Sequence, residues 1–148
     1  MRVSVIGGGT VGTEERHYEQ AQQVGKLLAK RSHTVVCGGR GGVMEAVCKG
    51  SSEAGGRSIG ILPGTDRSAA NPFLTVAIAT GRGNARNALV ALNGDGAIAI
   101  DGATGTLSEI GHALDFGRPV AGLDTHEIRG VEALGTPEEA VSYVEARA

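Results

Sequence analysis

The sequence predicts an α/β protein with a doubly wound, three-layer α/β/α architecture and a mostly parallel sheet of about six or seven strands. Three observations support this fold class. Short apolar segments alternate with amphipathic helical segments from one end of the chain to the other. The apolar segments lack a regular polar alternation, which is typical of strands covered on both faces. The connections between segments are short, which favours right-handed crossovers and therefore parallel strands.

The expected strands are the short segments rich in Val, Ile, Leu and Ala. In chain order they cover residues 3–6, 34–37, 58–62, 74–79, 97–100, 120–123 and, with the weakest pattern, 131–134. Apolar residues at spacings of three and four predict helices between them, over residues 13–31, 43–52, about 85–92 and about 107–114. A last helix is expected to begin after Thr136, because Thr136, Pro137 and Glu139 carry the signature of a capping box with proline in the first turn.

Composition narrows the class of protein further. The 148 residues fit a single Rossmann-like domain spanning residues 1–148. The chain has 14 basic and 16 acidic side chains, so it lacks the basic excess that nucleic-acid binding requires. No apolar segment is long enough to cross a membrane or to form a signal peptide, and a cytoplasmic protein is expected. Two cysteines and four scattered histidines show no metal-ligand spacing, so no metal site is expected.

Three glycine-rich turns follow three different expected strands, at residues 7–12, 38–42 and 102–106. A glycine backbone can approach a phosphate closely, and the first amides of a following helix can donate to it. We therefore expect a small phosphorylated ligand at the carboxyl ends of the strands. The residues expected to bind it are Gly8, Gly9, Thr10, Gly38, Gly39, Arg40, Gly41, Gly42, Arg82, Gly102, Thr104, Gly105 and Thr106.

Two other interpretations of the glycines remain open. In the first, the glycines serve only to make tight turns. In the second, the first turn is a dinucleotide fingerprint, because it matches G-x-G-x-x-G at Gly7, Gly9 and Gly12. The acidic residue that this fingerprint expects after the second strand is missing, and Arg40 stands near that place.

Arg86 and Glu109 are the candidate catalytic residues. Each lies near the start of an expected helix, so a guanidinium and a carboxylate can face the same crevice. An arginine binds phosphate through its planar fork, and a carboxylate can bond ribose hydroxyls or stabilise an oxocarbenium-like centre. The alternatives are that Glu109 forms a helix-capping box with Thr106, three residues earlier, and that Arg86 is a solvated helix residue.

Residues 38–46, Arg86 and residues 101–109 together resemble the LONELY GUY superfamily. The resemblance covers residues 3 to 123. The second motif of that family is P-G-G-x-G-T-x-x-E, and its enzymes remove the base from cytokinin riboside 5′-monophosphates with an arginine and that glutamate. The resemblance implies that Arg86 and Glu109 are the corresponding residues in this chain.

Three residues depart from the enzyme pattern. Asp101 replaces the proline of the motif, Ala103 replaces its second glycine, and Asn87 replaces the lysine that follows the arginine. The chain is more similar to the branch of molybdenum cofactor carrier proteins, which bind a phosphorylated pterin without turning it over. The resemblance thus implies the molybdenum cofactor as a bound ligand, with no other cofactor required.

We therefore expect a protein that binds a phosphorylated nucleotide-like or pterin ligand. The alternative is a nucleoside 5′-monophosphate phosphoribohydrolase, in which Arg86 and Glu109 cleave the N-glycosidic bond. Small apolar residues are frequent on the expected helices, which predicts a homo-oligomer, either a dimer or a tetramer.

Overall fold

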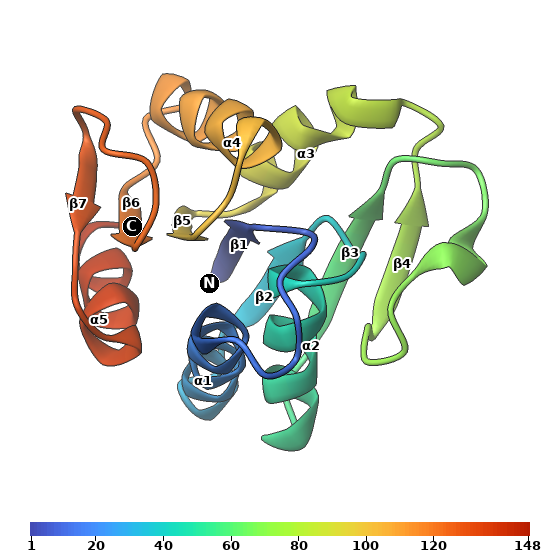
Figure 1. The fold of residues 1–148 in the computed structure, drawn as a ribbon, viewed down its shortest axis with the longest axis horizontal. Coiled ribbons are helices and arrows are strands. Elements are labelled where there is room, and N and C mark those ends of the chain that lie inside the picture. Colours follow the sequence, from blue (N-terminus) through green and yellow to red (C-terminus); the bar gives the residue numbers. More distant parts are fainter.

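The computed structural model describes all 148 residues and confirms the predicted α/β fold. Seven parallel strands form one sheet in the order β4-β3-β2-β1-β5-β6-β7 (Figure 1). The strands are β1 (Arg2–Gly7), β2 (Thr34–Cys37), β3 (Ser58–Leu62), β4 (Val76–Ala79), β5 (Gly96–Ile100), β6 (Val120–Leu123) and β7 (Val131–Ala133).

Five helices cover the two faces of the sheet. They are α1 (Arg16–Lys30), α2 (Val43–Glu53), α3 (Arg86–Asn93), α4 (Thr104–Asp115) and α5 (Pro137–Arg147), and the short 3-10 turns η1 (Arg67–Ala69) and η2 (Gly83–Ala85) precede β4 and α3. Helices α1, α2 and α5 pack on one face, and α3 and α4 pack on the other (Figure 1). None of these helices is long and apolar enough to cross a membrane.

The core follows from the apolar pattern of the strands. Every residue of β5 and β6 is buried, as expected for central strands of a doubly wound sheet. The largest cluster of buried residues joins the sheet to α1, α2 and α5, and it consists mostly of Val, Ala and Leu. A smaller cluster around Ile6, Val90 and Ile110 joins the sheet to α3 and α4.

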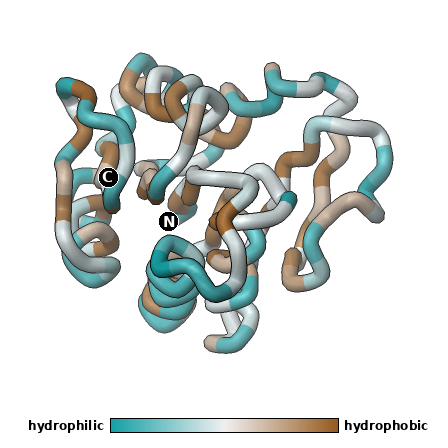
Figure 2. The backbone as a smooth tube through the Cα atoms, viewed as in Figure 1, coloured by the Kyte–Doolittle hydropathy of each residue, from teal (hydrophilic) through white to brown (hydrophobic).

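Most element boundaries match the sequence expectation, and three differ by more than one residue, among them the start of α4, which lies at Thr104 rather than at about residue 107. The first helix begins at Arg16 rather than at residue 13, so a long connection separates it from β1, pale after the strand and teal just before α1 (Figure 2). The fourth strand begins at Val76 rather than at residue 74. Leu74 instead packs against the core at the end of a turn, where its amide donates to the carbonyl of Asn71. At the last helix, the capping box of Thr136 and Glu139 forms as predicted.

Strand order reverses between β1 and β5, because the chain runs from β1 outward to β4 and then returns to β5. The crevice at the carboxyl ends of two such strands is where doubly wound proteins bind their ligands. The glycine-rich segments after β1 and β5 meet at this place, and they are pale in Figure 2 because glycine is neither strongly hydrophilic nor strongly hydrophobic.

Candidate functional site

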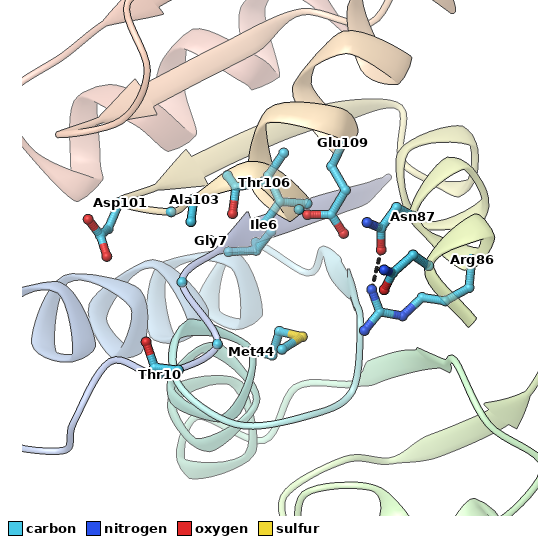
Figure 3. A pocket seen from close by; sticks show the side chains of 16 residues that line it. Ile6, Gly7, Thr10, Met44, Arg86, Asn87, Asp101, Ala103, Thr106 and Glu109 are labelled. Atoms are coloured by element: carbon cyan, nitrogen blue, oxygen red, sulfur yellow. Dashed lines mark hydrogen bonds between the residues drawn. The ribbon is translucent and has the colours of Figure 1, made fainter. Parts of the chain in front are cut away.

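A pocket of about 350 Å³ opens at the carboxyl ends of β1 and β5. One wall consists of the backbone after β1, and a second wall consists of the loop after β5 and the first turns of α4. Arg86 and Asn87 of α3 close the pocket at one end, and Asp101 lies at the other end (Figure 3). Eight of the expected site residues line it: Gly8, Gly9, Thr10, Arg86, Gly102, Gly105, Thr106 and Glu109.

Glu109 points into this pocket from inside α4 (Figure 3). Its side chain is only 6% exposed and forms no hydrogen bond within the protein. Burial raises the pKa of Glu109 to about 7, and the nearby positive charge of Arg86 opposes that rise. Glu109 is therefore present in both its neutral and its ionised form near neutral pH.

The capping-box alternative for Glu109 is wrong. Helix α4 begins at Thr104, two residues before Thr106, and its N-cap is Ala103, which offers no side-chain oxygen. Glu109 therefore lies beyond the first turn, where no free backbone amide remains for its carboxylate. Its carboxyl group is left to face the pocket.

Arg86 is the first residue of α3, and it lines the end of the pocket that α3 closes. Its guanidinium donates from Nη1 to the side-chain oxygen of Asn87. Its Nε atom is buried without any partner. Burial lowers the pKa of Arg86, and the negative charge of Glu109 counteracts this effect. A buried N–H group without a partner is costly, so a ligand that accepts from Arg86 would be favoured.

The loop after β5 forms the most strained part of the pocket. Asp101 adopts a left-handed conformation with φ of 52°, and Gly102 has φ of 110°. A Cβ on Gly102 would come within 2.3 Å of the Thr106 hydroxyl, so this position needs glycine. The Asp101 carboxylate lies against the backbone of Gly8, and His17 approaches it from α1 with Nδ1 at 3.9 Å.

The second glycine-rich turn does not line the pocket. Gly42 has φ of 63°, and a Cβ there would lie 2.1 Å from the carbonyl oxygen of Gly8. The amide of Val43 donates to that same oxygen at 3.0 Å. This turn therefore supports the first glycine loop from behind. Gly38 has a related role, because a Cβ there would lie 3.0 Å from Nη2 of Arg86.

Other expected residues also lie outside the pocket lining. Arg40, Arg82 and Thr104 are exposed, and Gly39 packs against Leu62 of β3. The first glycine loop also differs from a dinucleotide fingerprint. Because α1 begins only at Arg16, Gly12 does not stand at the start of a helix that could receive a phosphate.

Several residues that line the pocket lie outside the set expected to bind the ligand. Met44 and Asn84 are two of them. Met44 lies in the segment 38–46 that resembles the family, and the sequence carries no signal for Asn84. The pocket is also lined by Asn87, Asp101 and Ala103. The sequence marks these three residues only because each departs from a family motif. No group of three or more His, Cys, Asp or Glu side chains is arranged to hold a metal ion.

Comparison with known sequences adds a family assignment. The profile of the SLOG cluster4 family matches residues 1–147. An uncharacterized protein of Archaeoglobus fulgidus is 42% identical over 144 residues, which cover 97% of this chain and 93% of that protein. A cytokinin riboside 5′-monophosphate phosphoribohydrolase of Arabidopsis thaliana is 33% identical over 112 residues, which cover 74% of this chain and 49% of that enzyme. The match thus spans about half the length of the enzyme.

Solved structures with the same fold include a molybdenum cofactor binding protein and a molybdenum cofactor carrier protein. The molybdenum cofactor binding protein of the phototrophic bacterium Rippkaea orientalis superimposes with a TM-score of 0.91 at 31% identity, covering 98% of this chain and 95% of that one. The molybdenum cofactor carrier protein of Chlamydomonas reinhardtii superimposes with a TM-score of 0.88 at 31% identity, covering 98% and 96% of the two chains.

Proposed function

Because this chain belongs to the SLOG cluster4 family, within the LONELY GUY superfamily, we propose that it binds a phosphorylated nucleotide-like or pterin ligand and carries it unchanged. Its structural relatives that bind or carry the molybdenum cofactor favour that cofactor as the ligand. In this proposal the cofactor is cargo, so no chemical step depends on it.

One observation carries the proposal: the glycine-lined pocket contains two polar side chains that do not form all the hydrogen bonds of which they are capable. Nε of Arg86 is buried without a partner, and Glu109 is 6% exposed without a hydrogen bond. A buried N–H group such as Nε of Arg86 is usually satisfied in a folded protein. A ligand that accepts from Arg86 and bonds to Glu109 would satisfy both.

The residues present fit a phosphorylated ligand. A Cβ added to Gly105 would meet only Nδ2 of Asn87, at 3.9 Å, so the space above Gly105 is open. Gly105 and Thr106 lie in the first turn of α4, where free backbone amides and the helix dipole favour an anion. We propose that the phosphate binds there and beside Gly8, Gly9 and Thr10, and that Arg86 donates to another anionic oxygen of the ligand.

Isothermal titration calorimetry with AMP, GMP and a pterin phosphate tests this proposal. We expect at least one probe to bind, no free base to be released on prolonged incubation, and Arg86→Met to weaken binding. Mass spectrometry of the freshly purified protein checks for a ligand retained from the cell. Failure of every probe to bind would overturn the proposal. Release of free base that Glu109→Ala abolishes would establish the phosphoribohydrolase instead.

A further inference from the structure

Asn87 connects the two neighbouring helices α3 and α4, which both contribute residues to the pocket. It is the second residue of α3, lines the pocket, and is only 5% exposed. Its side chain accepts a hydrogen bond from Arg86 on its own helix (Figure 3) and donates one to Ser108 on α4. An amide buried this deeply needs partners for both its oxygen and its nitrogen.

The hydrogen bonds around Asn87 can run in only one direction. A guanidinium has donors and no acceptor, so Oδ1 of Asn87 must be the atom that faces Arg86. Nδ2 of Asn87 then donates to Oγ of Ser108 at 3.1 Å. Ser108 in turn donates to the carbonyl oxygen of Gly105 at 2.7 Å. The chain thus leads from the guanidinium to the first turn of α4.

From these hydrogen bonds we infer that Asn87 is a positioning residue, which holds the guanidinium of Arg86 toward the ligand through the acceptor Oδ1. The inference rests on the proposed function insofar as Arg86 contacts the ligand. Asn87 makes the only side-chain hydrogen bond of Arg86, and none of the six ion pairs in the structure includes Arg86.

The chemistry of the position favours asparagine over similar side chains. Aspartate can accept from Arg86 but cannot donate to Ser108, and leucine can do neither. Lysine, which the related enzyme motif carries at this place, can donate but cannot accept, and it would place a second cation beside Arg86. Of these four side chains, only asparagine continues the chain in both directions without adding a charge.

A buried asparagine between two helices could also serve packing alone, so the test must separate the two roles. Asn87→Leu removes both hydrogen bonds. The matched control, Ser108→Ala, removes the connection to α4 but leaves the acceptor at Arg86 in place. Asn87→Asp keeps that acceptor as well. A packing role predicts lower stability in all three variants, whereas a positioning role predicts that Arg86 is released only in Asn87→Leu.

Nitrogen-15 relaxation of the Arg86 Nε–H group measures this release directly and needs no ligand. We expect a rigid Nε–H in the wild type, Ser108→Ala and Asn87→Asp, and fast motion in Asn87→Leu. The signal is assigned by its absence in Arg86→Lys. If Asn87→Leu does not fold, the smaller Asn87→Ala gives the same readout. A guanidinium that stays rigid after loss of the acceptor would overturn the inference.

A double-mutant cycle with AMP as probe tests the consequence for binding. We expect Asn87→Leu to weaken AMP binding about tenfold, because the freed side chain must be immobilised again on binding. In the Arg86→Met background the same substitution should have no further effect. Equal losses in both backgrounds would overturn the inference. If AMP does not bind the wild type, the proposed nucleotide binding fails for this probe, and the relaxation measurement still decides the role of Asn87.

Discussion

Arg86 and Glu109 face one pocket from two different helices, yet they form no ion pair. The guanidinium is bonded to Asn87 instead. Burial therefore raises the pKa of Glu109 more than the charge of Arg86 lowers it, and this pKa is about 7. Both groups can therefore form further hydrogen bonds, as the polar groups of a binding site must before its ligand arrives.

The raised pKa of Glu109 predicts how stability changes with pH. The folded protein holds the proton of Glu109 more tightly than the unfolded chain, whose carboxyl has the ordinary pKa of 4.5. Stability from this group is therefore complete below pH 4.5 and is lost as pH rises to about 7. A difference of this size corresponds to about 3 kcal/mol in the free energy of unfolding.

Glu109→Gln should remove this dependence, because glutamine has no proton to lose. We expect the variant to match the wild type at about pH 4 and to be more stable by about 3 kcal/mol at about pH 8. Urea unfolding at the two pH values measures the difference. Glu138→Gln, at an exposed position on α5, is the control and should leave the wild-type pH dependence in place. Parallel curves for the wild type and Glu109→Gln would contradict the prediction.

Gly105→Val should block the pocket without unfolding the protein. A Cβ added to Gly105 meets no atom closer than 3.9 Å, and the backbone there is helical, so a side chain at this position begins in open space. Its methyl groups would occupy the space proposed for the phosphate. We expect calorimetric binding of AMP or a pterin phosphate to disappear while the melting temperature changes little.

Gly111→Val is the matched control for this substitution. Gly111 lies on the same helix and is exposed, and a Cβ added to it would meet no atom within 4 Å. The control variant should bind the ligand as the wild type does. Binding that survives in Gly105→Val would show that the ligand does not approach the first turn of α4.

The pocket itself was predictable from the sequence, because glycines followed two strands that a doubly wound fold brings together. The role of each glycine could not be predicted from the sequence. Gly42 and Gly105 look alike in the sequence, yet one fits against the carbonyl oxygen of Gly8 and the other borders open space. A close approach to backbone and a close approach to a ligand both require glycine, and only the packing of the two turns separates them.

The hydrogen bonds of Asn87 likewise could not be predicted from patterns in the sequence. Its partner Ser108 lies 21 residues away, and the contact depends on how α3 packs against α4. The exact start of α4 also mattered. A start at Thr104 rather than at Leu107, directly after a Thr106 cap, turns Glu109 from a helix cap into a pocket residue. Such shifts at a helix end are set by local backbone geometry, which periodicity does not determine.

The two kinds of glycine can be separated by their effect on stability. Gly42→Ala places a Cβ 2.1 Å from the carbonyl oxygen of Gly8, at a φ of 63° that alanine disfavours. We expect it to lower the free energy of unfolding by more than about 1 kcal/mol, the cost of the backbone conformation alone. Gly64→Ala, exposed and with open space around it, is the control and should change stability little. Thermal denaturation of both variants checks this, and equal melting temperatures would contradict it.

Asp101 places a negative charge in the pocket where we propose that a phosphate binds. Asp101→Asn should therefore strengthen the binding of AMP or a pterin phosphate. Asparagine tolerates the left-handed φ of 52° at this position, so the substitution changes the charge with little effect on the backbone. Removing one repulsive charge at about 4 Å in a watery site is worth about 1 kcal/mol, or roughly fivefold in affinity.

Asp124→Asn provides the matched comparison for Asp101→Asn. Asp124 also has a left-handed φ, of 50°, and also faces His17, with Oδ2 at 3.5 Å from Nε2, but it does not line this pocket. Its loss breaks an exposed ion pair with Arg16, which contributes little to stability. Calorimetric titrations at low and high salt should show a gain in affinity for Asp101→Asn alone, and the gain should shrink as salt screens the charge. Weaker binding in Asp101→Asn would mean instead that the carboxylate accepts a hydrogen bond from the ligand, so that the phosphate lies nearer to Arg86.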